Sequence, residues 1–427
     1  MKPERETWDV AVVGGGAAGM MAAGRAASCG AKVVLIEKNP GLGKKLLITG
    51  GGRCNVTNAE FDTRTLLSKF NRRGKKTDQF LFSPFSRHGV EDSIAFFNDR
   101  GMPTKIEANK RVFPLSNSAQ SVWGVLVQYM KEHNVRVISG IKVTKVVRDG
   151  NHISHIELAN GQRIIANSYI FATGGKSRAE TGSTGDGFNW LSSLGHTVSE
   201  PDASLVPLTL KDVWAKELAG VSLSNITLTL LQDGKKFGKQ SGGMVFTHQG
   251  ISGPAVLNLS RDVRDLLSYG QAILNLDLLP TKNQDALDTE LRSLLDQENK
   301  KVKNVLGTLL PGALISPVLT QADIDPDTQA NSVTRTQRLS LAKIIKNLSM
   351  EVKGLLGVEK AIVTSGGVDL TEIDFRTMRS RLVDNLYIIG DLLNIDRPSG
   401  GYSLQLCWTT GIVAGESAAQ AAEKGAA

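Results

Sequence analysis

The first residues of this chain with evident chemical potential are three glycines and an acid near its start. Gly14, Gly16 and Gly19 follow the apolar run Val10–Val13 and open a stretch rich in alanine and methionine. Glu37 lies 18 residues after Gly19, at the end of the apolar run KVVLIE. Glycines at this spacing permit a tight turn, a close approach of backbone to a pyrophosphate, and close packing of a helix on a strand. The pattern therefore predicts dinucleotide binding, with the acid accepting from ribose hydroxyls.

The same residues narrow the choice of dinucleotide. A helix that begins after Gly16, with Ala17 and Ala18 in its first turn, directs free N–H groups and partial positive charge at the phosphates. The carboxylate of Glu37 would repel a 2′-phosphate, which disfavours NADP in this site. This motif alone does not distinguish FAD from NAD.

A second set of residues lies far along the chain. The apolar run LYIIGD ends in Gly390 and Asp391, and a glycine turn at Gly401 leads into an amphipathic helix that begins at Tyr402. Asp391 is suited to bond the ribityl or pyrophosphate end, and the helix start is suited to face the N1–C2=O edge of a flavin. A flavin dinucleotide needs two separated segments to hold its two ends. The pair of motifs, about 375 residues apart, therefore favours FAD.

The stretch TGGGRCNVTN, residues 49–58, is a third candidate. Runs of glycine lose more conformational entropy on folding than other residues, so we expect close backbone approach there, with Arg53 beside it. Lys44 lies close in sequence to the phosphate site. Cys54 has two interpretations, a small residue packed in a tight loop or a redox or covalent partner of a flavin. A reactive thiol needs a depressed pKa, and no second cysteine adjoins it.

Two side chains are candidates for proton transfer to or from a substrate, His248 in FTHQGISGPA and Tyr402 in SGGYSLQ. Contact with the cofactor is the stronger expectation for Tyr402. The remaining histidines have no motif around them and are expected at the surface: His88, His133, His152, His155 and His196. No HExxH, GxSxG, Walker lysine motif or metal-ligand spacing occurs, so no metal is expected.

The electron donor is left open by the sequence. No second GxGxxG motif exists, so there is no separate nicotinamide domain. NADH or NADPH would reduce the flavin during a transient visit. The alternative is that a substrate reduces the flavin and oxygen reoxidises it.

Composition and charge limit the class of protein. A length of 427 residues suggests two or three domains, and 41% apolar with 22% charged residues is ordinary for a globular chain. Three scattered cysteines without a CxxC motif argue against a disulfide framework or zinc site. We find no signal-peptide core and no apolar run of about 18 residues. We therefore expect a reduced, cytoplasmic protein with no membrane partner.

The net charge of +8 fits a solvated surface, a bound anionic cofactor or an RNA partner. The densest basic cluster, FNRRGKKTDQF at 70–80, is short. It also lacks the repeated aromatic residues of a platform for single-stranded nucleic acid. Nucleic acid is therefore not the expected partner.

The elements that position these residues predict an α/β fold. Residues 8–40 predict strand, helix, strand, residues 60–134 a mainly helical region, and residues 135–173 short strands with hairpin turns at Asp149-Gly150 and Asn160-Gly161. The strand in YIFATGG, residues 169–175, is expected to pass near the cofactor. Composition changes near residue 195. We expect a Rossmann-like FAD-binding domain formed by 1–194 and 351–427, interrupted by an inserted domain at 195–350, β-barrel-like at about 195–280 and helical at 284–350.

The sequence resembles the BaiN-like, or aminoacetone-oxidase-type, flavoproteins of the glutathione-reductase-like FAD superfamily. The resemblance lies in VVGGGAAGMMAA, GKKLLITGGGRCNVTN, RVFPLSNSA, FATGG, STGDGF, FTHQGISGPAVLNLS, TSGGV and GGYSLQLCWTTGIVAG, and spans nearly the whole chain. It implies an FAD domain of the glutathione-reductase-like type with an insertion, and oxidoreductase chemistry with an NAD(P)H donor. The cofactor-binding residues expected from the motifs and the resemblance are Gly14, Gly16, Ala17, Ala18, Gly19, Glu37, Lys38, Lys44, Gly51, Gly52, Arg53, Cys54, Asn55, Val143, Ala172, Thr173, Gly174, Gly390, Asp391, Gly401, Tyr402, Ser403 and Leu404.

Three functions stay in competition at this point. The leading hypothesis is an FAD-dependent oxidoreductase that acts on a small organic molecule, as a NAD(P)H-fed reductase of C=C or C=O bonds. The second is an RNA-modifying flavoprotein, and the third a non-enzymatic FAD-dependent binding protein. The sequence leaves the substrate and the oligomeric state open.

Overall fold

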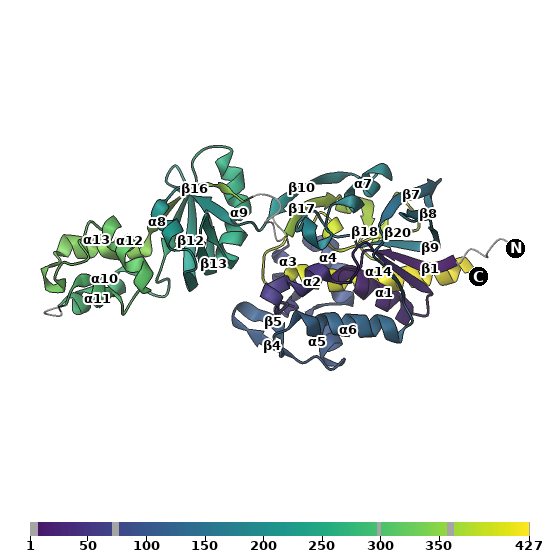
Figure 1. Cartoon of the computed structure of the whole chain (residues 1–427), viewed down its shortest axis with the longest axis horizontal. Coiled ribbons are helices and arrows are strands. Elements are labelled where there is room, and N and C mark those ends of the chain that lie inside the picture. The colour runs from purple at the N-terminus through teal and green to yellow at the C-terminus, as the bar shows by residue number, and fades with distance from the viewer. Residues whose placement is uncertain (1–6, 71–76, 297–299, 357–362, 427) are drawn as a thin grey trace. The chain divides into compact units, whose positions relative to one another are not determined.

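The computed structural model describes residues 7–70, 77–296, 300–356 and 363–426, which form two compact units (Figure 1). The first unit comprises Met1–Ala203 and Ile362–Ala427, and the second comprises Ser204–Ala361. The charges of the basic cluster at 70–80 fall on Arg72, Arg73, Lys75 and Lys76, which lie outside the described residues.

A parallel sheet in the order β20–β9–β1–β2–β6 forms the centre of the first unit. Its inner strands read as continuous apolar runs because both faces of the sheet are covered. All five residues of β2 are buried. The strands are β1 (Thr7–Val13), β2 (Val33–Glu37), β6 (Arg136–Ser139), β9 (Arg163–Phe171) and β20 (Leu386–Ile388).

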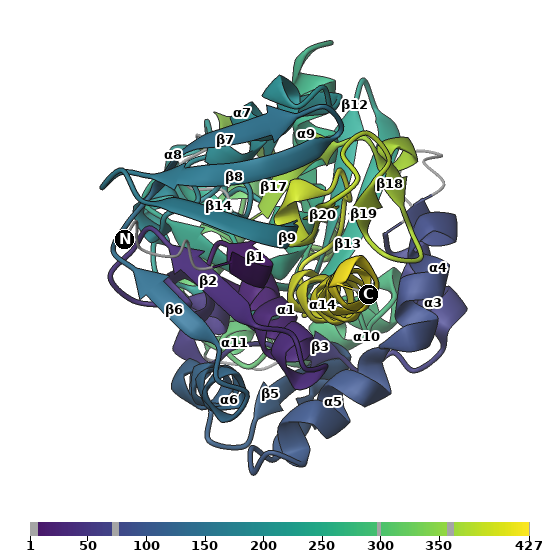
Figure 2. The ribbon, with the colours of Figure 1, turned by 90° about the vertical axis from the view of Figure 1, so that its right-hand side faces the viewer.

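Three helices lie together on one side of this sheet, and an antiparallel pair of strands lies on the other (Figure 2). The helices are α1 (Ala17–Ser28), α6 (Ala119–Glu132) and α14 (Tyr402–Ala426), and the strands are β7 (Val143–Asp149) and β8 (His152–Leu158). Small residues bring α14 close to α1. A Cβ on Gly411 would lie 2.9 Å from the carbonyl oxygen of Ala18, and one on Gly415 only 2.6 Å from that of Ala22.

The segment between β2 and α6 is less helical than the sequence suggested. Residues 60–134 also contain β4 (Thr104–Glu107) and β5 (Arg111–Pro114), which form a small sheet with β3 (Thr57–Asn58). Strands of four residues are too short to show a reliable alternation of apolar and polar residues. The helices here are α2 (Lys44–Leu47), α3 (Thr63–Ser68), α4 (Thr77–Arg87) and α5 (Val90–Asn98).

The rest of the first unit joins the sheet to the second unit. Helix α7 (Asp186–Ser193) leads to β10 (Val198–Ser204), which pairs with β17 (Val363–Val368). This pairing keeps the residues up to Ala203 in the first unit. Strands β18 (Ile373–Asp374) and β19 (Arg379–Ser380) extend the main sheet next to β20.

The second unit is a closed barrel with a helical extension. The strand order is β11–β14–β13–β12–β15–β16, and β16 pairs with β11 to close it. The strands are β11 (Leu208–Leu210), β12 (Ser222–Gln232), β13 (Lys235–Thr247), β14 (Gly250–Ser252), β15 (Ile273–Asp277) and β16 (Leu348–Leu355). The helices are α8 (Val213–Glu217), α9 (Pro254–Leu267), α10 (Gln284–Leu295), α11 (Val302–Leu306), α12 (Gly312–Gln321) and α13 (Arg335–Lys346).

Two histidines expected at the surface are buried instead. His88 is 8% exposed and His196 4% exposed, and burial lowers the pKa of both, to about 4 for His88. The ring of His196 lies between Glu372 and Ser380, at 2.9 Å from each. The Ser380 hydroxyl also accepts from the N–H groups of residues 382 and 383, so this buried group fixes a turn. Sequence periodicity does not reveal such a polar network, because its partners lie 176 and 184 residues away.

Candidate functional site

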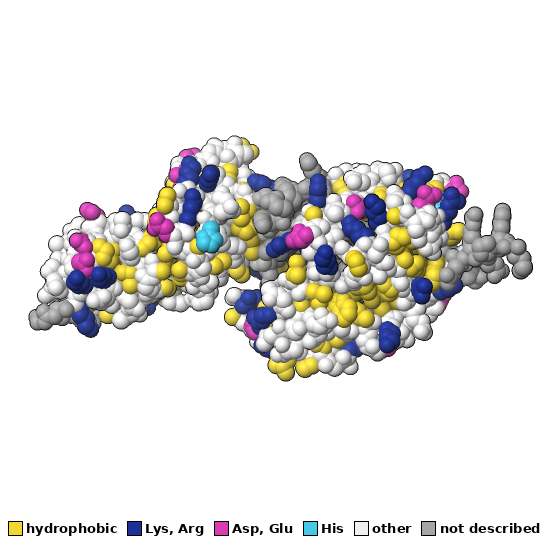
Figure 3. Space-filling model, in the orientation of Figure 1, with side chains coloured by type: hydrophobic (Ala, Val, Ile, Leu, Met, Phe, Trp, Pro, Cys, Tyr) yellow, Lys and Arg dark blue, Asp and Glu magenta, His cyan; other side chains and the backbone are white. Residues whose placement is uncertain are grey.

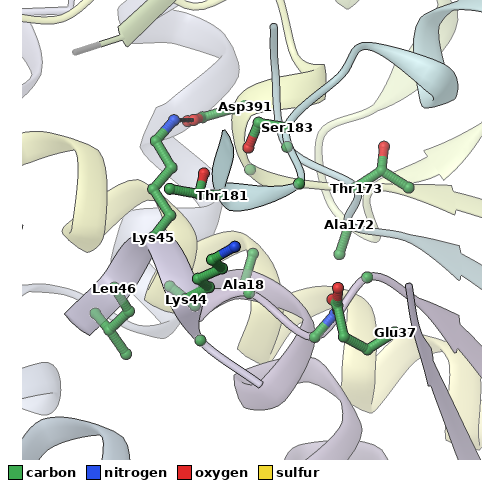
Figure 4. Close-up of a pocket in the computed structure, with 18 of the residues that line it drawn as sticks. Ala18, Glu37, Lys44, Lys45, Leu46, Ala172, Thr173, Thr181, Ser183 and Asp391 are labelled. Atoms are coloured by element: carbon green, nitrogen blue, oxygen red, sulfur yellow. Dashed lines mark hydrogen bonds and ion pairs between the residues drawn. The ribbon is translucent and has the colours of Figure 1, made fainter. Parts of the chain in front are cut away.

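A cavity in the first unit lies at the carboxyl ends of β1, β2, β9 and β20, next to the start of α14 (Figure 4). Open parallel sheets commonly bind ligands at this edge. Of the residues expected to bind the cofactor, those that line the cavity are Gly14, Gly16, Ala17, Ala18, Glu37, Lys38, Lys44, Ala172, Thr173, Gly174, Gly390, Asp391, Ser403 and Leu404. The structure thus brings together segments from both ends of the sequence.

The three glycines of the first motif have separate roles. Gly14 has φ +106°, and a Cβ there would lie 2.5 Å from the carbonyl oxygen of Ala172. A Cβ on Gly19, which does not line the cavity, would lie 1.8 Å from the carbonyl oxygen of Gly14. At Gly16, in contrast, no described atom lies within 4 Å of the Cβ position. Gly16 precedes α1, whose first turn has no side-chain cap, so its N–H groups face open space.

Glu37 holds the glycine turn from the end of β2. Its Oε2 accepts from the N–H of Gly15 at 2.7 Å, and its Oε1 accepts from the N–H of Asn39 at 2.7 Å. Oε1 also accepts from Asn39 Nδ2 at 2.8 Å, so the lone pair that stays free is on Oε2. The side chain can therefore brace the turn and still accept from a ribose hydroxyl in the cavity.

The segment 174–186, between β9 and α7, borders the cavity opposite the residues that follow β2. Side chains after β2 reach across to it. These contacts are Lys38 Nζ to Asp186 Oδ2 at 2.8 Å, Asn39 Nδ2 to Thr181 O at 3.0 Å, Lys44 Nζ to Glu180 O at 2.7 Å, and Lys45 Nζ to Ser177 Oγ at 2.8 Å. The three lysines also place positive charge beside a site suited to phosphates.

Asp391 forms the other end of the cavity with two cations. It pairs with the fully buried guanidinium of Arg397, and its Oδ2 lies 3.6 Å from Lys45 Nζ. Burial alone would raise the pKa of Asp391, but Arg397 and Lys45 outweigh it, and the pKa is lowered. Arg397 Nε also donates to Ser403 Oγ at 2.9 Å, in the first turn of α14. A carboxylate, a guanidinium and a helix start are thereby fixed at one place.

These features fit a bound FAD. The open space above Gly16 and the uncapped start of α1 suit a pyrophosphate, and Glu37 suits a ribose. Thr173 lines the cavity, and its buried Oγ1 has no hydrogen-bond partner among the described residues. A buried hydroxyl without a partner is costly, so this atom fits a ligand group. Asp391 and the start of α14 suit the ribityl and flavin end.

Only Thr49 of the stretch TGGGRCN belongs to this lining. Gly51, Gly52, Arg53, Cys54 and Asn55 do not line the cavity. Arg53 pairs with Glu107 and lies over the Phe113 ring, with its guanidinium carbon 4.2 Å from the ring centre. Burial raises the pKa of the Cys54 thiol to about 12, only partly offset by a hydrogen bond with Thr49. A protonated thiol is a poor nucleophile, so the packing interpretation of Cys54 is favoured.

The residues after that stretch hold the start of α14. Trp408 Nε1 donates to the carbonyl oxygen of Val56 at 2.9 Å, and Thr57 Oγ1 donates to Gln405 Oε1 at 2.6 Å. Asn58 Nδ2 donates to the carbonyl oxygen of Gly400 at 3.1 Å. A Cβ on the next residue, Gly401, would lie 2.3 Å from the Thr57 carbonyl carbon. The helix start is therefore pressed against β3.

The remaining candidates are not among the residues that line the cavity. Val143 borders a neighbouring hollow that shares Lys38 and Asp186 with the cavity. Tyr402 is 8% exposed and packs edge-on against Phe70, with ring centres 5.8 Å apart. Burial raises its pKa. His248 is exposed at the turn between β13 and β14 in the second unit.

The lining also includes residues beyond those expected. Asn39, Thr181, Ser183 and Cys407 are examples. Burial raises the pKa of the Cys407 thiol to about 12, and the nearby Asp391 carboxylate adds to this effect. The stretch STGDGF contributes to the family resemblance, but only the fold places it beside the residues that follow β2.

The sheet, the glycine turn and the two-ended cavity define a Rossmann-like FAD-binding domain. The chain belongs to the family described as the HI0933-like protein Rossmann domain, whose model matches residues 8–417. The resemblance to BaiN-like flavoproteins is confirmed by a relative that is 30% identical over 96% of this chain and 99% of its own length, 3-dehydro-bile acid delta(4,6)-reductase of Clostridium scindens.

Two further relatives carry another name. Ribosomal RNA dihydrouridine synthase of Escherichia coli is 30% identical over 95% of this chain and 96% of its own length. The protein of the same name from Haemophilus influenzae is 30% identical over 93% of this chain and 95% of its own length. These likenesses extend over both units.

Solved structures agree in fold. 3-Ketosteroid-delta4-(5alpha)-dehydrogenase of Rhodococcus jostii has a TM-score of 0.54 at 17% identity, covering 98% of each chain. 3-Ketosteroid delta1-dehydrogenase of Sterolibacterium denitrificans has a TM-score of 0.55 at 13% identity, covering 97% of this chain and 99% of its own. Family, relatives and fold together identify this chain as an FAD-dependent oxidoreductase.

No group of three or more His, Cys, Asp or Glu side chains is placed to hold a metal ion within the described ranges. In the same part of the chain, no helix has both the length and the apolar character needed to span a membrane.

Proposed function

We propose that this chain is a NAD(P)H-fed reductase that adds hydrogen across a C=C bond conjugated with a carbonyl group. The observation that carries the proposal is the single cavity lined by Gly14–Ala18, Gly390–Asp391 and the start of α14. It suits FAD held at both ends. Bound FAD supplies hydride transfer at its N5 atom.

The names of the relatives support this reaction class. A delta(4,6)-reductase and a dihydrouridine synthase both have names in which a ring C=C bond gains two hydrogens. The balance is one hydride to one carbon and one proton to its neighbour. The nicotinamide donor supplies the two electrons, and the proton comes from the protein or from water.

The chain's own residues bind and orient in this proposal. The start of α1 would bind the pyrophosphate, Glu37 would bind the adenosine ribose, and Thr173 would donate to a cofactor oxygen. Arg397 holds Asp391 and the first turn of α14, so both would be in place for the flavin end. Positive helix ends stabilise the negative charge that a reduced flavin carries. Tyr402 and His248 stay candidate proton donors.

A uracil ring in RNA is the substrate that a second set of observations favours. Two relatives have dihydrouridine synthase names, and the chain has a net charge of +8. On the face in Figure 3, basic and acidic side chains are interspersed, so the positive charge does not gather there into one broad patch. Small clusters of basic residues without ion pairs are therefore the places to look for an RNA-binding surface.

The test of the proposed function is an anaerobic visible spectrum of the purified protein before and after NADPH and then NADH. We expect a yellow protein that bleaches, and reoxidation on adding a conjugated cyclic enone or protein-free ribosomal RNA. Failure of both nicotinamides to bleach the flavin would remove the donor from the proposal. Bleaching without reoxidation by either acceptor would remove the reaction.

A further inference from the structure

We propose that the tip of the β12–β13 hairpin and the end of α9 form a docking surface for a single-stranded segment of RNA. The inference rests on the RNA candidate of the proposed function, and concerns a surface far in sequence from the FAD motifs. Both elements belong to the second unit (Figure 1).

The hairpin tip is basic and free of ion pairs. Lys235, Lys236 and Lys239 are exposed at the beginning of β13, and none has an ion pair or side-chain hydrogen bond to a described residue. Asp233, in the turn that precedes them, is exposed too. Lys353 is exposed in β16, one residue after Val352, whose N–H donates to Ala272 O at 3.0 Å beside the end of α9. Asp262 of α9 is a second acid here, with Oδ2 3.6 Å from the Cβ position of Gly238. The four lysines outnumber these two aspartates, so positive charge exceeds negative charge at this end of the barrel.

An aromatic side chain lies among these lysines because the strand is bulged. Leu230 pairs with Gly238 and Leu231 pairs with Lys236, so Phe237 is an extra residue without a partner on β12. A β-bulge redirects a side chain and raises the local twist. Phe237 is 51% exposed, although burial of a phenylalanine is favourable.

A second exposed aromatic lies next to the hairpin. Gln232, the last residue of β12, donates from Nε2 to Leu266 O at 2.9 Å, near the end of α9. The N–H of Tyr269 donates to the same carbonyl at 2.8 Å. Tyr269 is 85% exposed. The bond from Gln232 thus fixes this aromatic next to the basic hairpin tip.

Two exposed aromatic rings among unpaired lysines match the chemistry of an unpaired nucleic-acid strand. Bases stack on aromatic faces, and phosphates attract the lysines along the backbone. A ring reduced at a C=C bond must first leave its base stack, so an enzyme for this reaction gains from holding the flanking strand. The hairpin tip thus combines lysines with exposed aromatic residues, a combination that the basic cluster at 70–80 lacks.

The experiment compares RNA binding by the FAD-loaded full chain and three variants. The probe is protein-free ribosomal RNA, with a 20-nucleotide uridine-rich strand as a second probe, titrated at several salt concentrations. The variants are K235E/K236E/K239E, F237A/Y269A and the control K131E/K145E/K343E, which reverses three exposed lysines elsewhere. Flavin absorbance and thermal unfolding check that each variant is folded.

We expect the affinity of K235E/K236E/K239E for RNA to fall at least tenfold. The slope of log K against log salt concentration should become shallower by about 2, because three phosphate contacts are lost. We expect the RNA affinity of F237A/Y269A to fall by about 5- to 150-fold for each base that no longer stacks. The control should bind as the wild type does.

Two outcomes would overturn the inference separately from the function. If the wild type binds and reduces RNA and the hairpin variants do so equally well, the docking surface is wrong and the RNA function stands. If the wild type binds no RNA at low salt but reduces cyclic enones, both the RNA candidate and the surface fall, while the reductase stands. Binding of the hairpin to anionic lipid vesicles in preference to RNA would also overturn it.

Discussion

The two glycine-rich stretches of the first unit look alike in sequence but differ in what they contact. The glycines of the first stretch, Gly14–Gly19, either line the cavity or pack against its floor. The Cβ position of each one either clashes with a nearby protein atom or, at Gly16, points into the open space of the cavity. The second, Gly50–Gly52, lies outside the lining, and open space surrounds the Cβ positions of Gly51 and Gly52. A run of glycines therefore does not by itself indicate a ligand. The first stretch lines the cavity proposed for FAD, and the second leads into the strand that holds α14.

The largest effect is expected for Gly14→Ala. Its φ of +106° and the approach to Ala172 O both oppose a Cβ, and we expect a loss of about 2–5 kcal/mol in the free energy of unfolding. Gly30→Ala is the matched control, because Gly30 has φ +93° with no described atom near its Cβ position. Chemical denaturation measures both. If both variants lose the same free energy of unfolding, the positive φ alone accounts for the effect at Gly14, and the close approach to Ala172 O adds nothing.

Gly16→Val is expected to separate binding from folding. The apoprotein has room for the side chain, so its unfolding should change by about 1 kcal/mol or less. The same space is needed by the pyrophosphate, so FAD affinity should fall at least 100-fold, about 2.7 kcal/mol. Flavin fluorescence titration of the apoprotein measures the affinity. Full retention of FAD would show that the site is misplaced.

The burial of Cys54, which follows the second stretch, can be tested by the pH dependence of stability. Because its folded pKa of about 12 exceeds the unfolded value near 9, the unfolded thiol ionises first as pH rises. Stability should therefore fall between about pH 9 and 12, by roughly 1.4 kcal/mol per pH unit from this group. Cys54→Ala should show a shallower decline in the free energy of unfolding over that range. An unchanged slope, or rapid alkylation of Cys54 in the native protein at pH 7, would mean that the thiol is accessible.

The smallest effect is expected for Gly52→Ala. Its φ of +85° costs about 1 kcal/mol with a Cβ, and no clash is added. FAD affinity should stay within twofold of the wild type in the titration used for Gly16→Val. A larger loss of affinity would erase the contrast between the two stretches.

The sequence predicted those parts of the site in which the spacing of neighbouring residues is itself typical of a binding motif. The spacing of Gly14, Gly16, Gly19 and Glu37 led to the turn and its acid, and the Gly390–Asp391 motif led to the other end. The role of Arg53 stays a prediction, since the structure pairs it with Glu107 and Phe113 instead of the cavity.

What the sequence missed depends on distant contacts. The segment 174–186 reaches the lysines after β2 across more than 130 residues, and no periodicity records such a pairing. Arg397 is a different case, because its partners Asp391 and Ser403 each lie only six residues away, but no motif or periodicity marks a guanidinium between them. The α/β class and the FAD-binding fold followed from apolar runs and turn residues, but the strands β4 and β5 were too short to recognise.

The two-ended cavity has a consequence for translation. Its lining needs Gly14–Ala18 and also Gly390–Leu404, so a nascent chain that has emerged only as far as β9 lacks one wall. At about 5–20 residues per second, roughly 20 to 75 s separate the appearance of the two walls. During that interval the apolar face of α1 lacks α14. Both walls are needed to hold the cofactor at its two ends, so cofactor loading is one of the last events in the maturation of each molecule.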